Sequence, residues 1–117
     1  MEETKKLPGV ERALVKPEKV RDYLLSAEHP VGRFKAAYFE RLGYSRQEWH
    51  RFEQDILQMA RTGAVAERPA TRYGRKYEVS GILRGPSGRE ASVKTIWIVK
   101  VGEDFPTLVT VYPGDER

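Results

Sequence analysis

Six residues of the types that act on phosphate esters are spread along this 117-residue chain. Two lie around a proline that could start a helix, and four fall in segments with strand-like alternation. Cleaving RNA without a metal ion needs a base for the 2′-hydroxyl, fixed positive charge for the phosphorane and an acid for the leaving oxygen. The candidates for these roles are His29, Lys35, Lys76, Lys94, Thr110 and Tyr112.

The first two candidates flank a predicted helix start. Pro30 suits a first helical position, because its missing N–H would have no partner there in any case, and the free N–H groups of such a start can hold a phosphate. Lys35 would lie roughly 9 Å further from His29 along the axis, at about 1.5 Å per residue. A histidine before a proline also serves as a helix cap, so a purely structural role stays open for His29.

The positive charge is concentrated in one part of the chain. Residues 68–100 contain eight basic and two acidic residues, whereas the remainder contains 13 basic and 15 acidic ones. A field of this kind favours an anionic partner, with RNA first among the polyanions. The structural alternative is that lysine and arginine on strand faces only prevent aggregation through the sheet edges.

Several other kinds of site are excluded by the residues present. The chain has no cysteine, which removes disulfides, thiolate zinc sites and cysteine nucleophiles. His29 and His50 are 21 residues apart without a partner at metal-ligand spacing. The glycine-rich nucleotide motifs and the Gly-x-Ser-x-Gly esterase motif are missing as well. The sequence therefore predicts neither a metal site nor a cofactor.

The strongest secondary-structure signal is a predicted hairpin formed by residues 89–100 and 106–113, which we expect at the centre of the only sheet. Its first strand alternates with a period of two, which predicts Trp97 on the face toward the core and Lys94 on the opposite face. A further strand is predicted over 75–83, and a short edge strand over 64–69 that ends at its proline. Val109 and Val111 are expected in the core. Whether Thr110 and Tyr112 lie beside Lys94 depends on the hairpin register.

Three helices are predicted before the sheet, over 17–26, 30–42 and from residue 46 to about 60. Proline, acidic and capping-box residues mark their starts, and Gly43 is expected to end the second. The predicted buried stripes are Val20, Tyr23, Leu24 and Ala27 in the first helix, Val31, Phe34, Tyr38 and Leu42 in the second, and Trp49, Phe52, Ile56 and Met59 or Ala60 in the third. Residues 7–15 fit an edge strand or an extended lead-in.

These elements predict one α+β domain over residues 7–113, with the helices packed on one face of a three- to four-stranded antiparallel meander and frayed ends at 1–6 and 114–117. The longest apolar run is far shorter than the roughly 18 to 20 residues of a membrane span, and no signal segment is evident at the first residues. We expect a cytoplasmic protein that does not bind membranes.

Five short motifs carry a family resemblance: 29–35, 73–77, 85–89, 94–98 and 108–113. In this order they resemble an uncharacterised bacterial domain family that is often fused to polymorphic toxins. A wider similarity links the order of helices and strands to the barnase/EndoU/RelE-like ribonuclease toxins. That resemblance implies an active site built from the helical part and the sheet, at His29, Lys35, Lys76, Arg89, Thr110 and Tyr112.

The leading hypothesis is a metal-independent endoribonuclease-like domain. His29 and Tyr112 would transfer protons, and Lys35, as the third residue of the active site, would hold the phosphate together with Lys76 and Arg89. The residues expected to bind substrate are Arg75, Lys76, Arg89, Lys94 and Thr110. An acidic, antitoxin-like protein is the expected partner besides RNA. The alternatives are a non-catalytic module that binds nucleic acid or protein through the same face, and a purely structural protein.

Overall fold

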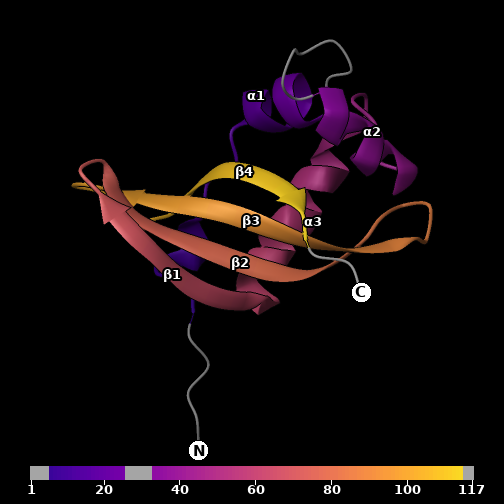
Figure 1. Ribbon diagram of the computed structural model, residues 1–117. Coiled ribbons are helices and arrows are strands. Elements are labelled where there is room, and N and C mark those ends of the chain that lie inside the picture. Colours follow the sequence, from indigo (N-terminus) through magenta and orange to yellow (C-terminus); the bar gives the residue numbers. More distant parts are fainter. Residues whose placement is uncertain (1–5, 26–32, 115–117) are drawn as a thin grey trace, which may run out of the picture.

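Four strands form one antiparallel sheet in the order β1-β2-β3-β4. The computed structural model describes residues 6–25 and 33–114, so His29, Pro30 and Val31 lie outside the described residues. The strands are β1 (Ala64–Thr71), β2 (Gly74–Arg84), β3 (Glu90–Lys100) and β4 (Thr107–Pro113). The predicted α+β class and the meander are confirmed (Figure 1).

The alternation predicted for β3 is confirmed by its burial. Val93, Thr95 and Trp97 are fully buried, and β3 pairs with both β2 and β4. The predicted pairing of residues 89–100 with 106–113 is therefore correct. The hairpin is not the centre of the sheet, however, because β4 is an edge strand and β2 and β3 occupy the middle.

The prediction that β1 ends at its proline is wrong. The strand continues to Thr71, and the register shifts between Arg68 and Thr71, where Pro69 lies. Because β1 is an edge strand with β2 as its only strand neighbour, a proline that cannot donate a hydrogen bond is tolerated there. Arg68 lies before this irregularity, in the regularly paired part of the strand, opposite Lys76.

α3 (Trp49–Thr62) supplies most of the helical cover of the sheet, and its predicted buried residues Phe52, Ile56, Met59 and Ala60 are confirmed. The helix begins three residues later than expected. The hydroxyl of Ser45 accepts a hydrogen bond from the Glu48 N–H at 3.2 Å, as in a capping box. That bond closes a turn over 45–48 instead of a first helical turn.

α2 (Arg33–Arg41) is followed by Gly43 in the left-handed region with φ 100°, so the predicted stop is confirmed. The predicted stripe of this helix missed Phe39, which is fully buried and packs against Phe52 with ring centroids 4.8 Å apart. Tyr44 stacks on the same Phe52 at 4.4 Å. This aromatic cluster orients α2, so Tyr38 is only half-buried. The side chains of residues 23, 24 and 33–35 lie outside the described part.

The first segments are less regular than predicted. Residues 17–24 form α1 (Pro17–Lys19) and a π-helical segment, η2 (Val20–Leu24), in place of a continuous α-helix. The segment before them contains the 3₁₀ turn η1 (Val10–Arg12) and a single parallel bridge between Leu14 and Thr107. Of the edge strand considered for residues 7–15, only Leu14 pairs with the sheet.

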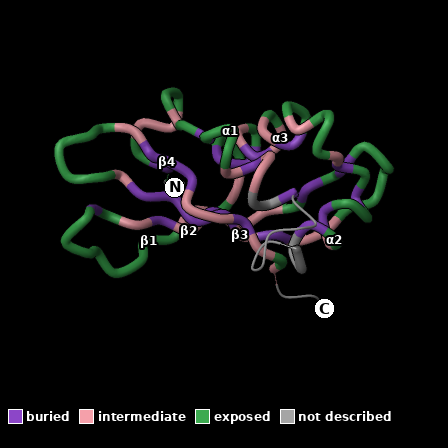
Figure 2. Tube along the Cα trace, turned by 90° about the horizontal axis from the view of Figure 1, so that it is seen from above, coloured by how far each residue is buried: buried purple, intermediate pink, exposed green. Residues whose placement is uncertain are grey.

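The two faces of the sheet are covered differently. α3 packs on one face, which we call the covered face, and α1 and α2 lie near the β4 edge (Figure 1). Buried chain segments run through the middle of the strands, and the connections at both ends of the sheet are exposed (Figure 2). No helix within the described residues is long and apolar enough to cross a membrane.

Candidate functional site

The opposite face, which we call the open face, carries no helix of the described chain (Figure 1). Strand pairing assigns its residues, because cross-strand partners point to the same side of a sheet. Its side chains are those of Arg68, Lys76, Glu78, Ser80, Lys94, Ile96, Ile98, Thr107, Thr110 and Tyr112.

A β-bulge in β4 decides which side chains reach this face. Ile96 pairs with Thr110, but the next residue of β3, Trp97, pairs with Leu108, so Val109 is the extra residue. Leu108 is buried on the covered face although it lies two residues from Thr110, which points to the open face. The expectation that Val109 belongs to the core is therefore wrong, because the bulge removes it from the paired positions and leaves it half-buried.

The carboxylate of Glu78 is the centre of a polar cluster on the open face. Arg68 Nη1 lies 2.7 Å from Glu78 Oε1, and Lys94 Nζ lies 3.9 Å from Glu78 Oε2. The hydroxyl of Ser80 donates to Oε2 at 3.4 Å. The Glu78 side chain is 16% exposed, against 45% for Arg68 and 33% for Lys94. The acidic group is thus held beneath two cations that remain open to solvent.

Tyr112 joins this cluster from the opposite edge strand. Hydrogen bonding to Glu78 and then to Tyr112 raises the pKa of Arg68. Tyr112 is also the direct cross-strand partner of Lys94. Arg68 on β1 is therefore bound to a carboxylate on β2 and is influenced by a phenol on β4.

Two isoleucines form an apolar floor beneath these polar groups. Ile96 and Ile98 are only 7% and 9% exposed, although both point to the open face. Their cross-strand neighbours are Glu78 and Thr110 for the first, and Lys76 and Thr107 for the second. The stems of long charged side chains cover apolar surface while their charged ends stay in water. The apolar stems of the cations can therefore pack on these two isoleucines while their charged ends stay in water.

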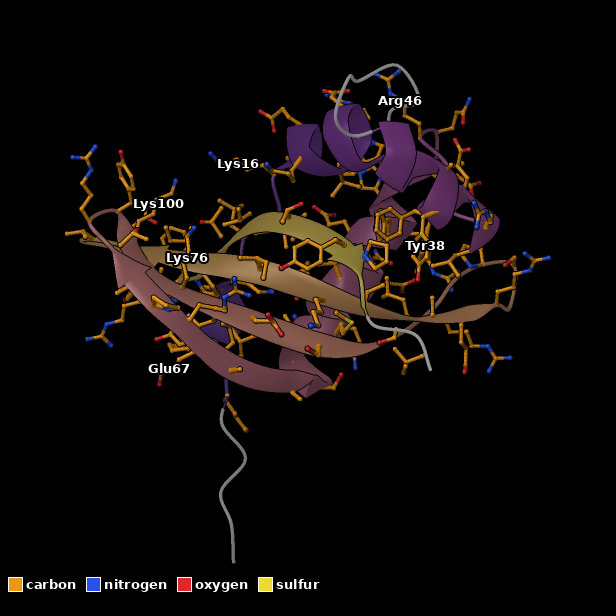
Figure 3. All side chains as sticks on the ribbon, viewed as in Figure 1. Lys16, Tyr38, Arg46, Glu67, Lys76 and Lys100 are labelled. Atoms are coloured by element: carbon orange, nitrogen blue, oxygen red, sulfur yellow. The ribbon has the colours of Figure 1, made fainter. Side chains whose placement is uncertain are left out.

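The structure brings together four of the predicted site residues. Lys76, Lys94, Thr110 and Tyr112 all lie on the open face, on three neighbouring strands. The open question of hairpin register is answered by the bulge, which places Thr110 and Tyr112 on the side of Lys94. Figure 3 shows Lys76 over the sheet.

The other predicted residues are not part of this group. Arg75 is the partner of Val99 and points to the covered side, one residue away from Lys76 on the opposite face. Arg89 lies in the exposed connection between β2 and β3, five residues before Lys94. His29 lies outside the described residues, and for Lys35 only the backbone position in α2 is described.

Sequence reasoning missed Arg68 and Glu78 as site residues. Their alternation was visible: Glu78 lies between Lys76 and Ser80 on the outward positions of its strand. Arg68 lies within the edge strand predicted over 64–69, but the residues that it meets on the next strand depend on the register of β1 and β2. The signal that could have identified Arg68 is an outward-facing arginine on an edge strand whose neighbouring strand carries an outward-facing lysine, Lys76.

Within residues 6–25 and 33–114, no group of three or more histidine, cysteine or acidic side chains could hold a metal ion. Two concavities lie elsewhere on the molecule. One of about 240 Å³ lies between α3 and β2, and one of about 390 Å³ lies at the β1–β2 and β3–β4 connections. The open-face cluster is therefore a surface site.

Comparison with known proteins gives a family and a fold. Residues 6–115 match the family described as a domain of unknown function (DUF6883), and the chain belongs to that family. No curated protein matches it. A solved structure with a similar fold is a chain of the "Contact-dependent growth inhibition toxin - immunity protein complex from Klebsiella pneumoniae 342". The TM-score is 0.69 at 16% identity, with 92% of this chain and 98% of the other covered.

Proposed function

We propose that this member of the DUF6883 family is a toxin-related endoribonuclease-like domain that acts on RNA phosphodiesters at its open face without a metal ion. The observation that carries the proposal is the cluster of Arg68, Glu78, Lys94 and Tyr112 on an uncovered sheet face. The toxin relation is supported by a fold similar to a chain of a toxin–immunity protein complex.

The charges of the cluster suit a phosphodiester. The open face carries three cations, Arg68, Lys76 and Lys94, and only one carboxylate among them, that of Glu78. It therefore keeps an excess of positive charge. Guanidinium and ammonium groups that are already in place stabilise the additional negative charge of a phosphorane without reorganisation. The planar guanidinium of Arg68 can also bind two phosphate oxygens at once.

Proton transfer is assigned to Tyr112 and His29. Tyr112 interacts with Arg68 and pairs with Lys94, so its hydroxyl stands next to the proposed phosphate position. The sequence pattern nominates His29 as the second proton-transfer group and Lys35 as a group that holds the phosphate. Glu78 acts as a positioning residue, because its carboxylate holds Arg68 and Lys94.

The test is RNA cleavage in the presence of EDTA. Purified protein is incubated with a mixed-sequence RNA, and the products are followed on a denaturing gel. We expect cleavage by the wild-type chain and a loss of about 100-fold or more in Arg68→Ala and in His29→Ala. Arg61→Ala removes an exposed arginine from α3 and serves as the matched control, with the rate unchanged.

Three outcomes contradict the proposal. No cleavage by the wild-type chain with or without added Mg²⁺, or equal cleavage by the wild type and the Arg68→Ala and His29→Ala variants, ends the ribonuclease assignment. Loss of all cleavage in EDTA with recovery on added Mg²⁺ contradicts its metal independence.

A second candidate function is a non-catalytic module that binds nucleic acid or an acidic protein. The neighbour's origin in a complex of two proteins favours a protein partner for this fold. Such a module would bind a polyanion with an affinity that falls steeply with salt and would show no turnover. Measuring binding and cleavage on the same RNA separates the two functions.

A further inference from the structure

At one end of the sheet, two chain connections lie side by side. Gly74 pairs with Lys100, and the N–H of Val101 donates to the carbonyl of Tyr73 at 3.0 Å. The β1–β2 turn and the β3–β4 connection therefore form one surface, at the end of the sheet where Figure 3 labels Lys100. We call this surface the basic tip and define it as Arg72, Tyr73, Arg75, Lys100 and Val101.

An exposed aromatic ring is the main feature of the basic tip. The side chain of Tyr73 is 63% exposed and that of Val101 is 76% exposed. The guanidinium carbon of Arg72 lies 5.1 Å from the centre of the Tyr73 ring, and Arg72 Nη2 donates to the Tyr73 hydroxyl at 3.0 Å. Arg72 thus holds an aromatic ring that contributes nothing to the core, with much of its surface in water.

The tip is also rich in positive charge. Arg75 and Lys100 line the concavity of about 390 Å³ at this end of the sheet, together with the acidic Glu103. Neither cation takes part in an ion pair within the described part of the chain, because the pairs found there involve other residues. With Arg72, the tip has three cations near one acidic group, a balance that attracts a polyanion.

The tip continues the charge of the open face. Lys94 and Lys100 occupy the same side of β3, and their six-residue separation corresponds to about 20 Å at about 3.3 Å per residue. Lys76 lies between them, opposite Ile98. A chain of negative charges can therefore follow one strand from the Glu78 cluster to Tyr73.

We infer that the basic tip binds a single-stranded RNA segment adjoining the cleaved bond, with one base stacked on Tyr73 and a backbone phosphate on Lys100. Stacking on an aromatic side chain beside a cationic path is how proteins bind single strands without reading their sequence. An acidic protein would use the cations but would leave the exposed ring without a comparable role. For RNA as the ligand, the inference rests on the proposed function.

The test measures binding without cleavage. A fluorescein-labelled 12-nucleotide RNA with 2′-O-methyl groups cannot be cut through its 2′-oxygen, and anisotropy gives its affinity. We expect Tyr73→Ala to weaken binding on the order of tenfold without a change in salt dependence, because about one stacked base is lost. Lys100→Gln should lower the slope of log affinity against log salt by about 0.7, the value for one phosphate contact on a single strand.

Matched variants show whether stacking is the cause. Tyr73→Phe keeps the ring and should bind within about threefold of wild type, whereas Ile82→Ala removes an exposed apolar side chain at the other end of the sheet and should change nothing. A double-stranded 2′-O-methyl probe should be insensitive to Tyr73→Ala, because its bases are already stacked. Thermal unfolding of each variant controls for folding.

Three results overturn the inference: Tyr73→Ala binds the 12-mer like wild type, Tyr73→Phe loses as much as Tyr73→Ala, or Tyr73→Ala weakens binding of polyglutamate but not of RNA. The last result would assign the tip to an acidic protein. The proposed function fails separately, because absence of cleavage is seen only with unmodified RNA, whereas the tip is tested by binding alone.

Discussion

On the covered face of the sheet, a buried hydroxyl is enclosed by its hydrogen-bond partners. Thr95 Oγ1 accepts from Trp97 Nε1 at 2.8 Å and donates to the carbonyl of Val79 at 3.0 Å. All three residues are fully buried beneath the helices. Among the described residues, no buried side-chain nitrogen or oxygen lacks a hydrogen-bond partner, as stability requires of polar groups removed from water.

On the open face of the same strands, a carboxylate is only partly enclosed. Glu78 is held by Arg68 and Lys94, and both cations remain accessible to a ligand. These cations exceed the charge of the single carboxylate. The buried polar groups of the covered face therefore have their hydrogen-bond partners within the protein, whereas the open face presents cations that can bind a ligand.

Alternation along a strand therefore separates the residues that stabilise the fold from those that can bind a ligand. Neighbouring residues such as Thr95 and Lys94 share a backbone but meet different surroundings. Substitutions on the covered face should lower the free energy of unfolding and leave binding per folded molecule intact. Substitutions on the open face should weaken binding and leave the free energy of unfolding nearly unchanged.

The largest effect is expected for Trp97→Ala, which empties the centre of the covered face. Removing a fully buried tryptophan should lower the free energy of unfolding by about 3 to 5 kcal/mol. Urea unfolding followed by circular dichroism measures it. Lys76→Ala on the open face is the control, with a change below about 0.5 kcal/mol. A loss below about 1 kcal/mol for Trp97→Ala would contradict the contrast between the faces.

Tyr112→Phe should slow RNA cleavage by about 100-fold, since general acid–base groups contribute that much or more. The ring stays in place, so unfolding in urea should change by less than about 1 kcal/mol. Tyr38→Phe is the matched control, because that hydroxyl donates to the Ser92 carbonyl at 3.4 Å and binds α2 to the sheet. Equal rates for Tyr112→Phe and wild type would remove Tyr112 from the chemistry.

Thr95→Val should cost about 1 to 3 kcal/mol of unfolding free energy, because the indole N–H of Trp97 would stay buried without an acceptor. RNA binding should not change, since the hydroxyl points toward the helices. Adding Trp97→Phe to Thr95→Val removes the orphaned donor, and the second substitution should then cost less than it does alone. Strict additivity in this double-mutant cycle would show that the hydrogen bond contributes nothing.

The smallest effect concerns Asp22, outside both faces. Hydrogen bonds from Arg21 and then from Arg46 lower the pKa of Asp22 to about 2. A lowered carboxyl pKa stabilises the fold above its ordinary pKa of 3.8, and this contribution is lost as the pH falls toward 2. The difference in melting temperature between wild type and Asp22→Asn should therefore be small at pH 6 and vanish near pH 2. A constant difference across this range would contradict the assigned cause.

Much of the fold could be predicted from local patterns. The faces of β2 and β3, the buried stripe of α3 and the stop at Gly43 depend on side chains a few residues apart, and the sequence displays those spacings directly. Lys76 and Lys94 were identified on the open face in the same way, whereas the face of Thr110 and Tyr112 depended on the strand register.

Other features depend on contacts between distant segments. The cluster of Phe39 and Phe52 decides how α2 is oriented, and the edge position of β1 allows that strand to continue through Pro69. No local spacing contains this information. The same is true of the π-helical turn at Val20–Leu24.

One apolar and one cationic face of the sheet could be predicted from the residues alone, because period-two alternation follows from strand geometry. Which cations meet depends on how the strands pair. The bulge at Val109 turned Thr110 and Tyr112 toward Lys94, and the pairing of β1 with β2 brought Arg68 over Glu78. Both depend on the pairing between strands, where an extra residue changes the face of every side chain that follows it.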